Sequence, residues 1–186
     1  MSELNKDKLL LSWAFSEAFS LRWGENFRCD FNLTDHNRVI QSKDPDQLST
    51  ELKQKLVSWL TVRRKKIIDK YIAPSKNFKL VTCPGEDIEK LVVMPEMAWK
   101  DQPVTLGEYI NMPYDGEILT DARVSAKILE ESRADAANFI GYPVIAYDEK
   151  LGTNVLVEGY TRCILLISTQ KKTKTYQPIQ VIICER

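Results

Sequence analysis

Five residues near the end of the chain have types and spacing that suit the binding of an anion. They are Glu158, Gly159, Tyr160, Thr161 and Arg162, and an apolar run stands on each side of them. This pattern predicts a strand that runs into a helix with one glycine at the junction. Backbone N–H groups at a helix start point toward a bound anion, and a nearby arginine neutralises its charge. Phosphate chemistry is therefore the first hypothesis.

The elements that must position these residues follow a regular order along the last third of the chain. Their apolar periodicity and their turn and cap residues predict a helix over 121–137 capped by Thr120 or Asp121, a strand over 143–147, a turn over 148–154, a strand over 155–157, a helix over 161–169, a basic loop over 170–174 and a strand over 178–184. This order predicts a small α+β core that occupies residues 111–186.

The sequence of residues 1–110 predicts a helical region that packs on this core. The expected elements are a helix over 6–23 stopped by Gly24, a loop over 25–46, a long helix over 47–73 ended by Pro74, short strands over 78–82 and 91–94, and a strand or short helix over 104–110.

The order of elements and the central motif together resemble the ParB/sulfiredoxin-like superfamily. In that family a proline leads into the first strand, and a hairpin follows. The next strand ends in Gly-Glu-Arg-Arg or Asp-Gly-x-x-Arg, before a helix and a last strand entered through a proline. Pro143, Glu158-Gly159-x-x-Arg162 and Pro178 match these positions. The resemblance covers about residues 115–186 and implies a mixed sheet with helices, preceded here by the helical N-terminal extension.

The resemblance implies nucleotide or phosphate binding, because members hydrolyse nucleoside triphosphates, cut DNA or phosphorylate free serine. Sulfiredoxins carry a reactive cysteine where this chain has Tyr160, so reduction of cysteine sulfinate is not expected. Cys163, which follows the arginine, is expected to face the core. The modules that follow the core in chromosome-segregation proteins are not seen after it, so a segregation role is not expected either.

Each residue of the motif has an expected role in such a site. Gly159 lets the backbone approach an anion, and the amides of Tyr160, Thr161 and Arg162 cradle a phosphate. Arg162 holds the phosphate in a bidentate way, and the hydroxyl of Thr161 adds a donor or helps to hold a metal. Glu158 orients Mg²⁺ or acts as a base on water, so the expected cofactors are Mg²⁺ and a nucleotide, with ATP first.

The same residues also allow a purely structural interpretation. Glu158 and Arg162 are four residues apart and could pair with each other at the helix start, with Gly159 serving only as a tight turn and Tyr160 as a surface aromatic. Further carboxylates that could complete a site precede the first helix of the core. They are Asp115, Glu117 and Asp121.

Two basic runs are candidates for contact with nucleic acid. The first is Arg63, Arg64, Lys65 and Lys66 in the long helix, and the second is Lys171 and Lys172 in the expected basic loop. Such runs most often form a solvated face, but adjacent cations also suit a phosphate backbone.

Composition limits the class of protein. The chain has 186 residues, 44% of them hydrophobic, and equal numbers of basic and acidic residues, 26 each. A packed domain is therefore expected, and a globally basic nucleic-acid binder is disfavoured. The single histidine and four dispersed cysteines exclude a His-rich metal site and give no close zinc spacing, which is typical of a reduced cytoplasmic protein. No secretory signal or membrane span is expected, and the sequence does not predict an oligomeric state.

The sequence is consistent with three functions. The first is a Mg²⁺-dependent ATPase or DNase that acts on a nucleotide or DNA. The second is a non-catalytic effector that binds a protein–DNA complex, such as a plasmid fertility-inhibition protein that blocks conjugative DNA transfer. The third is a domain in which Glu-Gly-x-x-Arg is only a turn.

Overall fold

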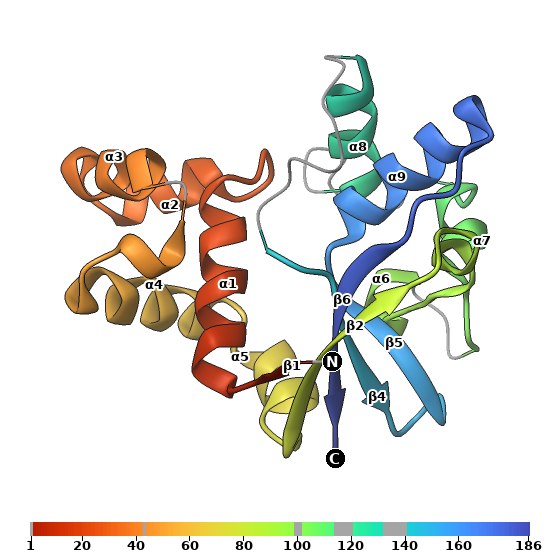
Figure 1. Ribbon diagram of the computed structural model, residues 1–186, viewed down its shortest axis with the longest axis horizontal. Coiled ribbons are helices and arrows are strands. Elements are labelled where there is room, and N and C mark those ends of the chain that lie inside the picture. The colour runs from red at the N-terminus through yellow and green to blue at the C-terminus, as the bar shows by residue number, and fades with distance from the viewer. Residues whose placement is uncertain (1, 43, 99–101, 114–120, 132–140) are drawn as a thin grey trace.

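The computed structural model describes residues 2–42, 44–98, 102–113, 121–131 and 141–186. Within these ranges, six strands form one mixed sheet in the order β1-β2-β6-β4-β5-β3 (Figure 1). Their bounds are β1 Ser2–Leu4, β2 Asn77–Cys83, β3 Val92–Val93, β4 Val144–Asp148, β5 Thr153–Glu158 and β6 Ile179–Glu185. The α+β class and the mixed sheet are therefore confirmed, whereas the ParB/sulfiredoxin-like arrangement stays a prediction.

Strand pairing joins the two ends of the chain. β2 runs antiparallel to both β1 and β6, and β6 runs parallel to β4. β4 and β5 form the antiparallel hairpin expected around 148–154, and β5 also pairs with β3 in parallel. The sheet is thus built by residues on both sides of position 110, so part of the N-terminal region is a sheet component.

Helices before β2 form a lobe beside the sheet (Figure 1). This lobe contains α1 (Lys6–Ala18), α2 (Gly24–Asp30), α3 (Leu33–Ser42), η1 (Pro45–Gln47), α4 (Thr50–Arg63), α5 (Lys65–Ile67) and the π-helical turn η2 (Ile68–Ile72). α1 packs along α4, and η2 contacts β4. The helical lobe therefore reaches the sheet through its last turn.

The other helices of the described ranges lie after β2. They are the 3₁₀ turn η3 (Gly85–Lys90), α6 (Pro95–Ala98), α7 (Leu106–Ile110), α8 (Ala122–Glu131) and α9 (Tyr160–Thr173). α9 packs against α8 and is buried along most of its first half. Because β4, β5, α9 and β6 follow one another as predicted, the element order of the C-terminal region is confirmed over the described residues.

Four predictions about local structure were wrong. The region 25–46 was expected to be a loop, yet it contains most of α2 and all of α3. Within it, the side chain of Asn32 accepts a hydrogen bond from the backbone N–H of Asp35 at 2.9 Å. Such capping by Asn starts a helix. The helix expected over 6–23 ends at Ala18, and Gly24, expected to stop it, begins α2.

The other two errors concern helix length. The helix expected over 47–73 is interrupted at Arg64, where φ is −109° and ψ is 17°. The basic loop expected over 170–174 is mostly helical, because α9 continues to Thr173 and ends at Lys174 in the left-handed conformation. The segment 132–137 of the helix expected over 121–137 lies outside the described residues.

Within the described ranges, no helix combines the length and apolar character that crossing a bilayer requires.

Candidate functional site

The predicted junction of strand, glycine and helix is present. β5 ends at Glu158, Gly159 has φ 96° and ψ 16°, and α9 begins at Tyr160. A Cβ atom on Gly159 would lie 2.8 Å from both Cα and Cβ of Pro143. Gly159 is therefore required by a left-handed backbone and by close packing on Pro143. The role of Gly159 in the close approach of an anion stays a prediction.

Tyr160 lies in the core and not on the surface. Its side chain is 4% exposed, and its hydroxyl accepts a hydrogen bond from the backbone N–H of Met94 at 3.0 Å. The same hydroxyl donates to the carbonyl of Leu156, four residues earlier in β5. Tyr160 thus ties the start of α9 to the end of β3 and to β5, which leaves its hydroxyl engaged within the protein.

Arg162 and Cys163 follow in the first turn of α9. Arg162 is 9% exposed, and its Nη1 donates a hydrogen bond to the carbonyl of Gly141. Cys163 is fully buried, as predicted, and burial raises the pKa of its thiol to about 12. A reactive thiolate is therefore not formed at this position near neutral pH.

Glu158 has the most strongly altered carboxyl group of the predicted site. Burial, reinforced by the charge of Glu17, raises its pKa to about 7, although the charges of Arg64, Arg22 and Arg162 act in the opposite direction. A carboxyl group with this pKa exchanges its proton near neutral pH, which is the property required of a general acid or base.

Glu17 brings the N-terminal lobe into the site. This carboxylate is 3% exposed on α1, and its Oε1 accepts hydrogen bonds from Nη2 of Arg64 at 2.7 Å, Nε of Arg64 at 3.1 Å and Nε1 of Trp13 at 3.2 Å. The paired charges account for the tolerance of a buried acid at this position.

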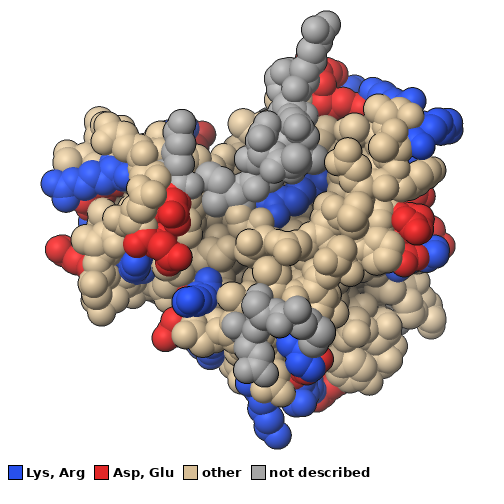
Figure 2. Space-filling view, viewed as in Figure 1, with Lys and Arg blue, Asp and Glu red and all other residues tan. Residues whose placement is uncertain are grey.

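Arg22 completes a group that we call the arginine cluster, defined as Arg22, Arg64 and Arg162 with Glu17 and Glu158. The charge of Arg22 acts on both acids, and burial lowers its own pKa. Its Nε atom is buried and makes no hydrogen bond within the described part of the chain. Figure 2 shows a hollow between the N-terminal lobe and the sheet, with Lys or Arg side chains beside it. The arginine cluster thus combines three separate segments and keeps one donor available.

Sequence reasoning did not find Glu17 or Arg22. One signal was present for Glu17, because an acid stood among Trp13, Ala14 and Ala18 on the apolar face of a helix. A carboxylate in such a place requires a partner, but its partner is 47 positions away, at Arg64.

The candidate nucleic-acid residues separate into distinct environments. Arg63 donates through Nε to Asp30 at 2.7 Å, Arg64 belongs to the arginine cluster, and Lys65 pairs with Asp69 at 2.5 Å, while Lys66 is exposed. Lys171 pairs with Glu89 at 3.2 Å and Lys172 pairs with Glu130. Figure 1 places α4 and the end of α9 on opposite sides of the molecule, so the structure does not join the two basic runs into one surface.

Among the additional carboxylates, Asp121 is described and Asp115 and Glu117 lie outside the described residues. Asp121 binds the guanidinium of Arg123 at 2.6 Å and caps α8 by accepting from the backbone N–H of Arg123 at 2.8 Å. Burial alone would raise the pKa of Asp121, but these bonds hold it below its usual value. The charge of Arg22 acts on Asp121 as well as on Glu158, so the two acids share one neighbour.

Two carboxylates among three guanidinium groups form a donor set that suits an anion better than a resident Mg²⁺. Over the described ranges, no group of three or more His, Cys, Asp and Glu side chains is placed to hold a metal ion. Mg²⁺ at Glu158 stays a prediction.

Comparisons with protein-family models, with curated proteins and with solved structures found no match to this chain.

Proposed function

We propose that this protein binds a phosphate group of a nucleotide or nucleic acid at the arginine cluster. One observation carries the proposal: the charges of Arg22, Arg64 and Arg162, from different segments, all act on Glu158, and Nε of Arg22 is buried with no hydrogen-bond partner among the described residues. The cluster has one more cation than anion when both acids are ionised. A phosphate would accept the free donor and offset this excess charge.

The chemistry that fits this site is the cleavage of a phosphoanhydride or phosphodiester bond, as in an ATPase or DNase. Glu158, with its pKa of about 7, would take a proton from the attacking water. The arginines would stabilise charge that develops on the phosphate oxygens. A Mg²⁺ ion held mainly by the phosphates of the ligand would supply further charge neutralisation.

Local order along the chain supports this class. The described elements run from α8 through β4, β5 and α9 to β6, with Glu158-Gly159-x-x-Arg162 between β5 and α9. This is the order on which the ParB/sulfiredoxin-like resemblance rests, and it is the reason for preferring nucleotide or DNA over other phosphate compounds. We place the protein in the cytoplasm, where such ligands occur and where its four free cysteines stay reduced.

A second candidate function is a non-catalytic effector that binds a protein–DNA complex, with fertility inhibition as one example. The observation that favours it is the use of Gly159 and Tyr160 in packing, which leaves Glu158 as a countercharge for three arginines. In this case the arginine cluster would bind phosphate without turnover.

The binding test compares two ligands with two variants. Isothermal titration calorimetry with ATP and with tripolyphosphate should show that both bind the wild-type protein. Arg22→Gln should weaken both by tenfold or more, since a hydrogen bond to a charged group contributes about 1.5–3 kcal/mol. Lys66→Gln, which removes an exposed cation from the adjacent helix, serves as the matched control and should change affinity by less than threefold.

If neither ligand binds, or if the two variants lose affinity equally, the proposed phosphate site is refuted. Hydrolysis then separates the two candidate functions. Glu158→Gln should retain binding and lose ATP or DNA cleavage if the protein is an enzyme. If wild-type protein binds but does not cleave either substrate with Mg²⁺ present, the effector function is the one that stands.

A further inference from the structure

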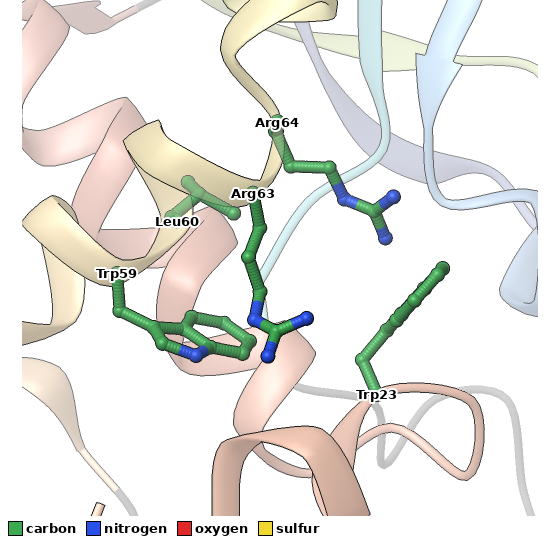
Figure 3. Close-up of a pocket in the computed structure, with 5 residues that line it drawn as sticks. All are labelled: Trp23, Trp59, Leu60, Arg63 and Arg64. Carbon is green, nitrogen blue, oxygen red and sulfur yellow. The ribbon is translucent and has the colours of Figure 1, made fainter. Parts of the chain in front are cut away.

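A cavity of about 130 Å³ lies next to the arginine cluster, within the N-terminal lobe. Its lining consists of Trp23, Trp59, Leu60, Arg63 and Arg64. Figure 3 shows the two indole rings on opposite sides, with the guanidinium group of Arg63 between them and that of Arg64 facing Trp23. The cavity is therefore bounded by two aromatic rings and two cations.

One wall is fixed from behind by Asp30. This carboxylate accepts hydrogen bonds from Nε1 of Trp59 and from Nε of Arg63, both at 2.7 Å. The Trp59 ring also packs edge-on against Phe27, with ring centroids 5.2 Å apart at 90°. These contacts position the Trp59 ring and the Arg63 guanidinium through residues that do not line the cavity.

The opposite wall is shared with the arginine cluster. The guanidinium of Arg64 lies 4.1 Å from the centroid of the Trp23 ring, and that of Arg22 lies 5.6 Å from the same ring. Glu17 holds Arg64 in this position by the bonds described above. Trp23 is thus the element that connects the cavity with the proposed phosphate site.

The size and lining of the cavity select the kind of group that fits. A cavity of about 150 Å³ in another protein holds one benzene ring, so the space here suits part or all of one planar aromatic group and not a whole nucleotide. Two cations in the wall disfavour a cationic group. Indole rings and guanidinium planes both stack on aromatic bases, and such stacking tolerates different bases.

We propose that the cavity between Trp23 and Trp59 takes the base of a nucleotide or of a single DNA strand, with the attached phosphate at the arginine cluster. This inference rests on the proposed function, because it assigns the second half of the same ligand. The N-terminal lobe then supplies the base subsite, and the loop at Gly159 contributes Arg162 on the phosphate side.

The test uses the full chain and three probes: ATP, single-stranded oligothymidylate and tripolyphosphate. Trp23→Leu removes one ring at the edge of the cavity but none of the arginines. It should weaken binding of ATP or of the oligonucleotide by about tenfold, within the range measured for loss of one stacked base, and leave tripolyphosphate affinity within twofold. Trp23→Phe, which keeps a ring, should restore most of the affinity.

Far-UV circular dichroism and urea unfolding establish that the variants are folded before binding is measured. The affinities of the wild-type protein identify the kind of ligand. Tighter binding of the oligonucleotide indicates a DNA strand, and tighter binding of ATP indicates a free nucleotide. Either result agrees with a base subsite.

Equal loss for all three probes, or no loss for the base-bearing ones, overturns the base subsite while leaving the phosphate site intact. If tripolyphosphate also fails to bind the wild-type protein, both the proposed phosphate site and the base subsite are refuted.

Discussion

Substitution of Gly159 by alanine tests whether the glycine of the motif serves packing. The new Cβ atom would lie 2.8 Å from Cα and Cβ of Pro143 and 3.0 Å from its Cγ, in a backbone with φ 96°. Left-handed backbone costs an alanine roughly 1–2 kcal/mol, and overpacking costs roughly 1–3 kcal/mol. The free energy of unfolding should therefore fall by about 2–5 kcal/mol.

Gly152→Ala is the matched control for this change. Gly152 also has a positive φ, 66°, but the nearest atom that its Cβ would meet is the Tyr147 hydroxyl oxygen at 4.0 Å. The control should therefore show the backbone cost alone, roughly 1–2 kcal/mol. The difference between the two variants, about 1–3 kcal/mol, isolates the contact with Pro143.

Urea unfolding monitored by circular dichroism measures both variants under the same conditions. For a chain of this length, each kcal/mol also lowers the melting temperature by about 2–4 °C. If Gly159→Ala and Gly152→Ala agree within about 0.5 kcal/mol, the close packing on Pro143 is refuted. The glycine would then be required by its left-handed backbone alone.

Three further substitutions test the buried polar groups. Tyr160→Phe should lower the free energy of unfolding, measured by urea denaturation, by about 1–3 kcal/mol, because two buried backbone groups lose their hydrogen-bond partner. The control Tyr176→Phe, at an exposed position, should change the free energy of unfolding by less than about 0.5 kcal/mol. Glu158 has a folded-state pKa of about 7, above its ordinary value of 4.5, so wild-type stability should fall as pH rises from about 4.5 to 7. Glu158→Gln should remove roughly 1–3 kcal/mol of that fall, and identical pH profiles would contradict the assignment. Asp148 is fully buried, and its hydrogen bonds with Tyr71 and Lys70 hold its pKa below the ordinary value of 3.8, although burial acts in the opposite direction. The wild-type protein should therefore lose stability as the pH falls through the folded-state pKa of Asp148. Asp148→Asn should flatten the acid side of the curve of stability against pH.

The C-terminal elements were predictable because local signals mark their ends. Gly141 and Pro143 precede β4, the turn with Gly152 fixes the hairpin, and Gly159 separates β5 from α9. These residues act through backbone conformation, which depends little on distant parts of the chain. A local signal gave the wrong prediction at Asn32, because a polar residue that caps a helix resembles a loop residue in the sequence.

The arginine cluster was only half predictable, because its pairings are long-range. Glu158 and Arg162 carry a recognisable spacing, but the residues that alter the pKa of Glu158 include Glu17 and Arg64, at separations of 141 and 94 positions. Arg64 was assigned to a basic run by its neighbours in sequence, whereas its hydrogen bonds bind it to a buried acid. A run of basic residues in the sequence does not show which of their side chains lie together, because the fold determines the surroundings of each one.

The position of the arginine cluster indicates that the helical lobe is part of the site. Arg162 and Glu158 come from the C-terminal region, but Glu17, Arg22 and Arg64 come from α1, the turn after it and the residue that follows α4. The break of the long helix at Arg64 lies where that side chain reaches Glu17 on α1, between α4 and the short helices that lead to the sheet. A site that needs charges from both regions cannot be reproduced by residues 111–186 alone. If the arginine cluster binds phosphate as proposed, the N-terminal residues supply three of its five charged groups, Glu17, Arg22 and Arg64.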